Sequence, residues 1–388
     1  MSSLLEQYAQ ALEERASTNN LRSLRACRTL PEAKIELNGK VLVNFASNDY
    51  LGLSQSEKLK ERAIEYTRLY GVGNGASRLL SGNHQIFEKI EKKLAALKGT
   101  QTALILPSGF QTNSSLIPSL LQKESPAFAD RLVHRSIIEG LLLSKSRFAR
   151  YRHNDNEDLQ NRLSSRNSED KEGWIFTESV FSMDGDRCDL PALLSTSKQE
   201  RLALYVDEAH ATGVLGRNGM GLTAGLEFNG ISMGTFGKGL GSFGAYICSS
   251  TVMRDYLINF FPGLIYSTAL PPPVLGAIDA ALDLVPDLDK ERERLAASAD
   301  TLRHGLKKMG FDCGASSTQI IPIILSSSAA AIKLSQDLEN AGFYVPAIRP
   351  PTVAEGSARL RLSLTVLHSK EQIEDFQNTL RRWHEKKS

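Results

Sequence analysis

Between about residues 46 and 270, short apolar runs alternate with longer helical patterns, and this alternation restricts the fold more than any other feature. The intervening segment 84–99 has helical spacing, because its apolar residues recur every three or four positions. Strands of near-continuous apolar character, separated by helices, predict a mostly parallel sheet covered on both faces, and therefore an α/β fold. The expected strands lie in TALILP, SPAFAD, GWIFTES, RLALYVDEAH, ISMGTFGK and GAYICSS.

Two further regions flank this alternating part. The first forty residues predict one amphipathic helix, followed by an extended piece around KIELNGKVLVNFAS. The prolines in Leu-Pro-Pro-Pro, 270–273, suit the first turn of a helix that would run to about Gly310. Beyond it, QIIPIILS, SSAAAIKLSQDLENAG, FYVPAI, ARLRLSLT and EQIEDFQNTLRRW predict a compact β-α-β-β-α set. We therefore expect an N-terminal segment at 1–45, a large domain at 46–272, and a linker helix with a smaller α/β domain at 273–388.

The charges nearly cancel, with 46 basic and 44 acidic residues among 388 and a net charge of +2. Nucleic-acid and membrane partners usually require a concentrated basic patch. The short cluster Arg22, Arg25 and Arg28 is better interpreted as a solvated helix face, or as one arginine with a function, than as a DNA-binding arm. We expect neither nucleic acid nor a membrane as a partner.

The four cysteines lie far apart and form no C-x-x-C motif, so we expect neither a disulfide framework nor a metal site made from them. Three glutamates fall within the first sixteen residues, where a signal peptide would need an apolar run. No uninterrupted apolar stretch approaches the roughly 18 residues of a transmembrane helix. These patterns predict a soluble, cytoplasmic protein.

Lys238 stands between glycines in the motif T-F-G-K-G-L-G, 235–241, directly after the expected strand ISMGTF. A lysine that binds a flat cofactor covalently needs room beside its backbone, and glycines provide that room. The alternative is a solvent-exposed lysine in a flexible turn. The motif lacks the G-x-x-x-x-G-K-[ST] spacing of a P-loop, which argues against a nucleotide site.

Asp207 and His210 close the apolar strand RLALY in the motif V-D-E-A-H. A carboxylate at the end of a buried strand is unfavourable unless it has a cationic partner, and a pyridinium nitrogen is such a partner. His210 could hydrogen-bond the phenolic oxygen of the same ring. A metal site at Asp207 and His210, or a Walker-B-like acidic pair, are the rival interpretations, and neither finds its other half in the sequence. Asp207 and Lys238, at successive strand ends, suit the two poles of one cofactor ring.

Three other segments have a less specific pattern. The motif L-P-S-G-F-Q, 106–111, lies between a strand and a helix, where backbone amides form an anion site that suits a phosphate, although a simple strand-to-helix turn has the same pattern. His134 follows another expected strand and is either a structural hydrogen-bonder or a group that stacks on a cofactor ring. The glycine-rich stretch 71–78 follows a helix, which argues against a dinucleotide fingerprint and favours a loop close to substrate.

Together these segments resemble the α-oxoamine synthase family of fold-type-I pyridoxal-phosphate enzymes, over about residues 44–365. The resemblance implies a large domain with a mostly parallel central sheet and a smaller α/β C-terminal domain. Ala76 departs from the family, whose loop usually has a second glycine there, and we expect only a small change in backbone freedom. The segments that carry the resemblance are 47–53 (S-N-D-Y-L-G-L), 71–78, 177–186 (T-E-S-V-F-S-M-D-G-D), 206–210 and 235–239.

The resemblance also implies roles for residues at matching positions. Lys238 would bind pyridoxal phosphate covalently and move protons at the substrate Cα, Asp207 would pair with the pyridinium nitrogen, and His134 would stack on the ring. Ser182 and His210 would contact the cofactor near its phenolic oxygen. The phosphate would be held by Ser108, Gly109, Phe110 and Thr235, with Thr268 from a second subunit.

Substrate contacts would come from other parts of the chain. The resemblance implies that Arg361 binds the amino acid carboxylate, and that Arg22, Asn48, His134 and Thr352 touch substrate. Because Thr268 would serve a neighbouring site, it also implies a homodimer with shared active sites.

Within the family, three segments resemble the member of biotin biosynthesis most closely: 265–272, 348–353 and 358–363. That member condenses L-alanine with a pimeloyl thioester, carried on coenzyme A or on an acyl carrier protein, and releases carbon dioxide and the thiol. One alternative is a family member that uses glycine or serine with another acyl donor. An alternative of a different class is an inactive partner subunit, against which the joint presence of Lys238, Asp207 and His210 argues.

Overall fold

The computed structural model describes residues 3–164 and 172–385. These residues form two compact units. The larger unit comprises residues 49–182 and 187–293, and the smaller comprises residues up to 48, 183–186 and those from 294 onward.

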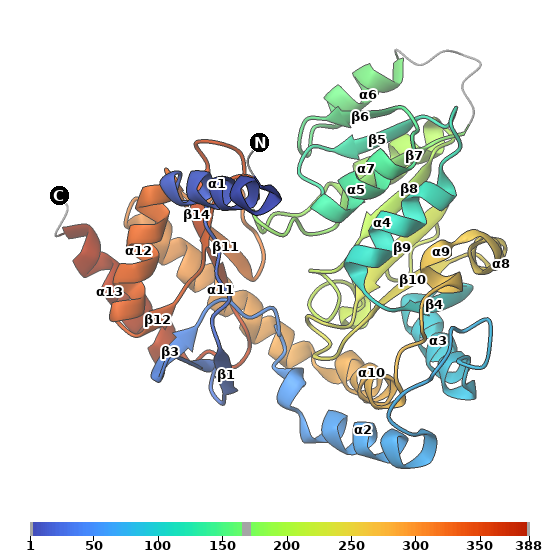
Figure 1. Ribbon diagram of the computed structural model, residues 1–388, viewed down its shortest axis with the longest axis horizontal. Helices are drawn as coiled ribbons and strands as arrows, with labels where there is room; N and C mark the ends of the chain where they lie inside the picture. The colour runs from blue at the N-terminus through green and yellow to red at the C-terminus, as the bar shows by residue number, and fades with distance from the viewer. Residues whose placement is uncertain (1–2, 165–171, 386–388) are drawn as a thin grey trace. The chain divides into compact units, whose positions relative to one another are not determined.

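A seven-stranded sheet forms the centre of the larger unit (Figure 1). Its order is β4-β10-β9-β8-β7-β5-β6, in which β10 runs antiparallel to both neighbours and the other strands are parallel to one another. All six predicted strands belong to this sheet, and β6 is an addition. The mostly parallel α/β fold is therefore confirmed. The strands are β4 (Thr102–Leu106), β5 (Ala127–Asp130), β6 (Phe148–Tyr151), β7 (Trp174–Glu178), β8 (Ala203–Asp207), β9 (Gly230–Thr235) and β10 (Ala245–Ser249).

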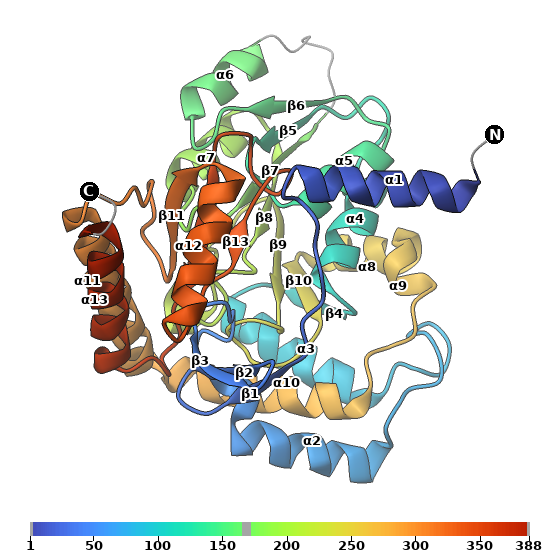
Figure 2. The same cartoon turned by 60° about the vertical axis from the view of Figure 1, so that its left-hand side comes forward.

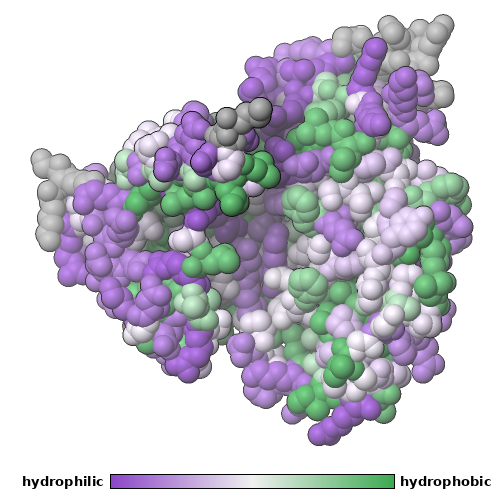
Figure 3. Space-filling model, in the orientation of Figure 1, coloured by the Kyte–Doolittle hydropathy of each residue, from purple (hydrophilic) through white to green (hydrophobic). Residues whose placement is uncertain are grey.

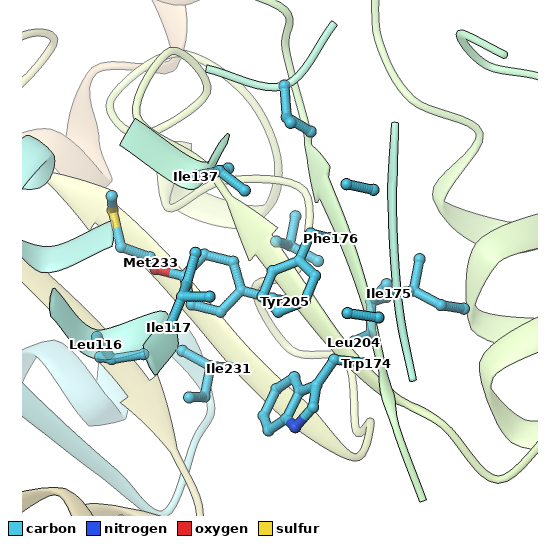
Figure 4. Close-up of a cluster of buried hydrophobic side chains, with 14 of the residues drawn as sticks. Leu116, Ile117, Ile137, Trp174, Ile175, Phe176, Leu204, Tyr205, Ile231 and Met233 are labelled. Atoms are coloured by element: carbon cyan, nitrogen blue, oxygen red, sulfur yellow. The ribbon is translucent and has the colours of Figure 1, made fainter. Parts of the chain in front are cut away.

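Helices α4 (Gly109–Leu120) and α5 (Arg135–Leu143) pack on this sheet through aliphatic side chains. Figure 4 shows Leu116, Ile117 and Ile137 from these helices gathered with side chains from β7, β8 and β9. Each fully buried aliphatic side chain contributes about 1.5–3 kcal/mol to folding. This core fixes the first turns of α4 and α5 beside the carboxyl ends of the parallel strands.

The other helices of the larger unit complete its covering layers (Figure 1). They are α2 (Glu57–Tyr70), α3 (Gln85–Lys98), α6 (Asn156–Ser164), α7 (Leu190–Gln199), α8 (Thr251–Phe260), α9 (Pro262–Ile265) and α10 (Pro272–Leu284), with 3-10 turns η1 (Leu53–Gln55), η2 (Arg217–Gly219) and η3 (Val285–Asp287).

A buried carboxylate holds α10 against α2 and α3. Asp279 of α10 is fully buried and accepts hydrogen bonds from Arg62 (2.7 Å), Tyr66 (2.7 Å) and Lys89 (3.1 Å), and it also contacts Lys93. Burial alone would raise the pKa of Asp279, but hydrogen bonds from Lys93, Tyr66 and Lys89 outweigh it and hold that pKa at about 2. Because the pKa is depressed in the folded state, the stabilisation is present above the ordinary value of 3.8 and is lost as pH falls through about 2.

Replacing Asp279 with asparagine is expected to lower the free energy of unfolding by about 2–3 kcal/mol. This loss is smaller than that from breaking a fully buried ion pair, because the basic partners of Asp279 are partly exposed. Urea unfolding at neutral pH measures the change. Asp283 lies one turn further along α10, contacts Lys93 at 2.5 Å and is half-exposed, so it provides a matched control. Asp283→Asn should cost less than about 1 kcal/mol. Equal losses for the two variants would contradict the burial argument.

The smaller unit contains two sheets, of order β1-β2-β3-β12 and β11-β14-β13. In the first, β12 runs parallel to β3, and its other pairings are antiparallel. The second is antiparallel throughout. The strands are β1 (Cys27–Leu30), β2 (Lys34–Leu37), β3 (Lys40–Asn44), β11 (Ile320–Ser326), β12 (Phe343–Tyr344), β13 (Ala347–Ile348) and β14 (Ala358–Ser363).

Among the described residues, the smaller unit also contains α1 (Leu4–Ser17), α12 (Ser328–Asn340), α13 (Lys370–Glu385) and most of α11 (Asp289–Lys308), whose first five residues belong to the larger unit. In Figure 2, α11 and α13 lie side by side, and Gln377 of α13 donates to the carbonyl oxygen of Thr301 in α11 at 3.3 Å. Helix α13 buries Ile373, Phe376 and Leu380, which share one face at helical spacing. Among residues 3–164 and 172–385, every helix is too short or too polar to cross a membrane.

Three local predictions were wrong. The predicted forty-residue helix ends at Ser17, because Asn19 adopts a left-handed conformation and the residues from Cys27 onward pair as strands. The predicted helix from 273 to about 310 is interrupted by η3, which contains Pro286. The predicted strand FYVPAI is two short strands in different sheets, β12 against β3 and β13 against β14.

The two compact units also divide the chain differently from the predicted organisation at 1–45, 46–272 and 273–388. The N-terminal residues belong to the smaller unit because β3 pairs with β12. Helix α10 belongs to the larger unit, where Asp279 binds residues of α2 and α3. The chain therefore passes between the units at residues 48, 182, 186 and 293.

Candidate active site

A cavity of about 340 Å³ opens at the carboxyl edge of the parallel strands in the larger unit. Its walls come from the segments that follow β4, β5, β7, β8 and β9, and from the start of the antiparallel β10. In open α/β sheets this edge is the usual place for a ligand. The cavity lining includes eight predicted cofactor residues: Ser108, Gly109, Phe110, His134, Asp207, His210, Thr235 and Lys238.

The amine of Lys238 contacts the buried imidazole of His210, which follows β8. Its Nζ lies 2.8 Å from Nε2 of His210, and Nδ1 of His210 lies 2.6 Å from the hydroxyl of Tyr50. Both His210 and Tyr50 are buried. The three groups form a continuous path along which a proton can be shared between the lysine amine and the interior.

Replacing Tyr50 with phenylalanine removes the hydroxyl that contacts His210. One buried hydrogen bond contributes about 0.5–1.5 kcal/mol, so kcat/KM is expected to fall about 2- to 10-fold. Tyr246→Phe is a matched control, because that hydroxyl bonds Thr212 at 2.8 Å in the same unit. Steady-state kinetics of both variants test the path, and an equal effect of the two substitutions would contradict it.

Asp207 is buried at the end of β8 with both carboxylate oxygens occupied. Oδ1 accepts the backbone N–H of Ala209 at 2.9 Å, and Oδ2 accepts a side-chain N–H of Asn113 at 2.8 Å. The hydroxyl of Tyr205 donates to Oδ1 of Asn113 at 2.6 Å. These contacts orient the carboxylate at the floor of the cavity.

His134 caps α5, and its ring faces the open cavity. Its Nδ1 lies 2.7 Å from Oγ of Ser136 and accepts the backbone N–H of Ser136 at 3.3 Å. The Phe110 ring stands edge-on to the imidazole, with centroids 6.4 Å apart. Partial burial by the surrounding protein lowers the pKa of His134, Asp207 opposes this shift, and Lys238 adds to it.

The first turn of α4 forms an anion cradle. Ser108 caps the helix and accepts the N–H of Gln111 at 3.3 Å. A Cβ on Gly109 would come within 2.7 Å of the Thr235 side chain, so a larger residue there would force that side chain to shift. Within the described part of the chain, the buried hydroxyl of Thr235 has no hydrogen-bond partner. Helix-start amides and a spare hydroxyl suit a phosphate group.

Glu178 is a carboxyl of the cavity that the sequence-based prediction missed. It pairs in register with Asp207 across β7 and β8, and its Oε1 is buried without a partner among the described residues. Burial raises the pKa of Glu178 well above its usual range; Asp207 adds to the shift and Lys238 opposes it. Asn113 and Ser136 were also missed. The signals available were their spacing, four residues after Gly109 and two after His134.

The remaining predicted residues lie outside this cavity lining. Ser182 is buried in the larger unit, and Thr268 pairs with Ser77 in an isolated bridge there. In the loop 71–78, Arg78 lies 4.2 Å from the centre of the Phe87 ring.

Of the five predicted substrate residues, His134 lines the cavity of the larger unit, and the other four belong to the smaller unit, where the structure brings them together in two pairs. Arg22 donates to Thr352 at 2.9 Å, and Arg361 donates to Asn48 at 3.2 Å. Arg361 also donates to Ser363 at 2.6 Å.

Comparison with known proteins identifies the relatives of this chain. The model of the aminotransferase class I and II family matches residues 40–380. A protein of Bordetella pertussis, provisionally named 8-amino-7-oxononanoate synthase, is 48% identical over 383 residues, covering 97% of this chain and 96% of its own. The 8-amino-7-oxononanoate synthase of Gluconacetobacter diazotrophicus is 45% identical over 353 residues, covering 89% of each chain.

Solved structures show the same fold. Serine palmitoyltransferase from S. paucimobilis, solved with a bound PLP–myriocin aldimine, has a TM-score of 0.92 at 26% identity and covers 98% of both chains. The crystal structure of 8-amino-7-oxononanoate synthase from Francisella tularensis has a TM-score of 0.76 at 28% identity, covering 89% of this chain and 98% of that one. The predicted fold-type-I transferase fold is confirmed. The chain therefore belongs to the aminotransferase class I and II family, among relatives named 8-amino-7-oxononanoate synthase.

Proposed function

We propose that this protein is a pyridoxal-phosphate-dependent acyltransferase that condenses L-alanine with a pimeloyl thioester to 8-amino-7-oxononanoate in biotin biosynthesis. The observation that carries the proposal is the placement of Lys238, His210 and Asp207 in one cavity. Relatives of this name that are 44–50% identical support the choice of reaction. The thioester would be carried on coenzyme A or on an acyl carrier protein.

The residues of the cavity fit pyridoxal phosphate at both ends. The first turn of α4 and the Thr235 hydroxyl, which has no hydrogen-bond partner among the described residues, suit its phosphate, and Asp207 suits a protonated ring nitrogen. Phe110, Ser108 and Gly109 border the phosphate end. When bound, this cofactor withdraws electrons from the Cα of an amino acid, which makes the Cα proton removable.

Five side chains divide the work of proton transfer and orientation. Lys238 takes the Cα proton and later returns it, with His210 and Tyr50 sharing charge along their hydrogen-bonded path. A base within hydrogen-bond reach contributes roughly 10²- to 10⁴-fold. The negative charge of Asp207 would hold a proton on the nitrogen of the cofactor ring. His134 would cover one face of that ring and exclude water from it.

The condensation balances with these roles. The Cα of alanine loses its proton to Lys238 and bonds to the acyl carbonyl carbon, and the C–S bond breaks to release a thiolate, which takes a proton from solvent to become the thiol. The resulting β-keto acid loses carbon dioxide, and a proton returns to Cα. No oxidant or reductant is needed.

Four of the five proposed substrate contacts are residues of the smaller unit. Arg361 binds the alanine carboxylate, and its bonds to Asn48 and Ser363 hold the guanidinium in place. Arg22 and Thr352, which already contact each other, touch substrate. Ser182 would contact the cofactor near its phenolic oxygen.

We extend the proposal to a homodimer with shared sites, in which Thr268 reaches the phosphate of the neighbouring subunit. Large apolar side chains close in sequence to the Ser77–Thr268 bridge are strongly exposed when the chain is taken alone. They include Leu80, whose exposed fraction is 80%, and Tyr266, whose exposed fraction is 83%. Figure 3 shows hydrophobic areas on the visible face of the larger unit. Exposed patches of this kind mark interaction surfaces. A cytoplasmic location is also proposed, and the four free cysteines support it.

A second candidate is another α-oxoamine synthase, which the higher TM-score of serine palmitoyltransferase favours. Titration of the cofactor-loaded protein with L-alanine, glycine and L-serine separates the two. L-alanine is expected to change the visible absorbance at the lowest concentration, and alanine with pimeloyl thioester is expected to yield 8-amino-7-oxononanoate and carbon dioxide. A preference for serine or glycine would favour the second candidate. Absence of any response to all three would favour an inactive partner subunit.

A further inference from the structure

Asn113 stands at the centre of a buried hydrogen-bond network that joins two walls of the cavity. Its side chain lies within 2.9 Å of three partners: the carboxylate of Asp207, the hydroxyl of Ser136 and the hydroxyl of Tyr205. Asn113, Ser136 and Tyr205 are at most 1% exposed. A fully satisfied buried network of this kind fixes side-chain orientation, because any rearrangement leaves a polar group without a partner.

The chemistry of the partners fixes the direction of the three hydrogen bonds of the Asn113 side chain. The carboxylate of Asp207 accepts only, so the NH2 group of Asn113, not its oxygen, must face Asp207. Oδ1 of Asn113 then receives the Tyr205 hydroxyl at 2.6 Å. The second N–H of Asn113 points to Oγ of Ser136 at 2.9 Å. Both amide hydrogens are thereby used, and Ser136 is an acceptor toward Asn113.

The hydrogen-bond directions at Asn113 also bear on those at Ser136 and His134. The Ser136 hydroxyl accepts from Asn113 through its oxygen and keeps its proton to donate to Nδ1 of His134, 2.7 Å away. The backbone N–H of Ser136 points to the same nitrogen at 3.3 Å, and a backbone N–H can only donate. Nδ1 of His134 therefore accepts from two donors and carries no proton. The neutral ring then holds its proton on Nε2.

We propose that Asn113 is a positioning residue that holds the Asp207 carboxylate in place and, through Ser136, keeps His134 as the neutral tautomer with its proton on Nε2. The inference rests on the proposed function, in which Asp207 would pair with the nitrogen of the cofactor ring and His134 would stack on a face of the same ring. A neutral imidazole stacks on a protonated ring without charge repulsion. It also presents one N–H donor to the cavity.

The surroundings of His134 agree with a neutral ring. The titratable groups that face it are Asp207 from β8, Glu178 from β7 and Lys238 after β9. Partial burial lowers the pKa of His134, and Lys238 adds to the shift against the opposing effect of Asp207. The hydrogen-bond directions strengthen this tendency, because protonating Nδ1 would set an N–H against the backbone N–H of Ser136.

The test is ¹⁵N NMR of the cofactor-loaded, full-length protein with ¹⁵N-labelled histidine. The seven histidines are separated by comparison with His134→Asn, which lacks one signal. The wild-type protein is expected to show Nδ1 of His134 without a proton and Nε2 with one. A proton on Nδ1 at neutral pH would overturn the proposal without any variant. Because the spectrum needs no turnover, an inactive protein with the expected tautomer would contradict only the proposed function.

Two variants then distinguish a specific effect of Asn113 on His134 from a general loosening of the packing around the site. Asn113→Ala frees Ser136 Oγ to accept from Nδ1, so the pKa of His134 should rise by about 1, the equivalent of one hydrogen bond. Ser136→Ala removes the hydroxyl that would accept that proton, so the pKa should stay low. Equal rises in both variants would indicate entry of water and overturn the proposal.

A third variant on the same helix serves as the structural control. Thr112 is buried, and its hydroxyl donates to the Ser108 carbonyl oxygen at 2.7 Å, so Thr112→Val removes one buried hydroxyl outside the network. The His134 signals should be unchanged. The acid limb of the pH profile of kcat/KM should move to higher pH in Asn113→Ala and stay in place in Thr112→Val. Movement in both would show that the network has no specific role.

Discussion

Replacing Lys238 with alanine is expected to abolish the condensation. The variant loses the amine that lies 2.8 Å from His210 and with it both the covalent hold on the cofactor and the base for the Cα proton. Loss of one positioned acid–base group alone lowers kcat roughly 10²- to 10⁴-fold. Turnover of L-alanine with pimeloyl thioester, followed by release of carbon dioxide, measures the effect.

Two companion variants make this prediction specific. Lys238→Arg keeps the positive charge but cannot form the covalent bond, so it is expected to be as inactive as alanine. Lys123 is exposed and lies outside the cavity, so Lys123→Ala should retain wild-type rates. Wild-type turnover in Lys238→Ala would remove this residue from the mechanism.

Replacing Asp207 with asparagine is expected to have the second largest effect. Its two oxygens accept N–H groups of Ala209 and Asn113, and an asparagine amide would have to turn its own NH2 toward one of these donors. The substitution also removes the charge opposite the ring nitrogen. Losing one partner of a buried charged pair costs about 3–5 kcal/mol, which corresponds to a fall in kcat/KM of roughly 10²- to 10³-fold or more.

Cofactor affinity and kinetics together test the role of this carboxylate. Asp207→Asn should bind pyridoxal phosphate more weakly and lower kcat, whereas Asp255→Asn, an exposed carboxylate on α8, should change neither. Near-normal kcat for Asp207→Asn would show that the ring nitrogen has another partner.

The central sheet could be predicted because most of its strands are buried on both faces. Runs such as ALYVD and WIFTE are apolar nearly throughout, and the structure places them at the middle of the sheet. Strand β6 was missed because it lies at the sheet edge, where Phe148, Ala149 and Arg150 are partly or fully exposed and no continuous apolar run is needed. Edge strands carry a weaker sequence signal for this physical reason.

The candidate site was predictable where its residues follow a strand directly. Asp207, Lys238 and His134 each stand near the end of an apolar run, and parallel strands end at one edge of the sheet. Their supporting partners were not predictable. Asn113 and Asp207 are 94 residues apart in sequence, and Tyr50 and His210 are 160 apart. Such pairs arise only when α4 and the segment 47–53, which contains Tyr50, pack against the sheet.

In the smaller unit, the pairing of short strands likewise could not be predicted from the sequence. The segment FYVPAI contains the apolar pattern of one strand, but Val345 and Pro346 separate two pairings in different sheets. The partners are β3, almost three hundred residues earlier in the chain, and β14. Local periodicity predicts that such a segment is extended, but it does not predict which strand the segment pairs with.

Borohydride reduction of the cofactor-loaded protein, followed by peptide mass spectrometry, identifies the lysine that holds the cofactor. Reduction makes the bond between the cofactor and that lysine permanent. We predict that the visible absorbance is bleached and that the added mass lies on the peptide containing Lys238. Added mass on another lysine, or no added mass after loading with pyridoxal phosphate, would contradict the assignment of Lys238 as the residue that binds the cofactor.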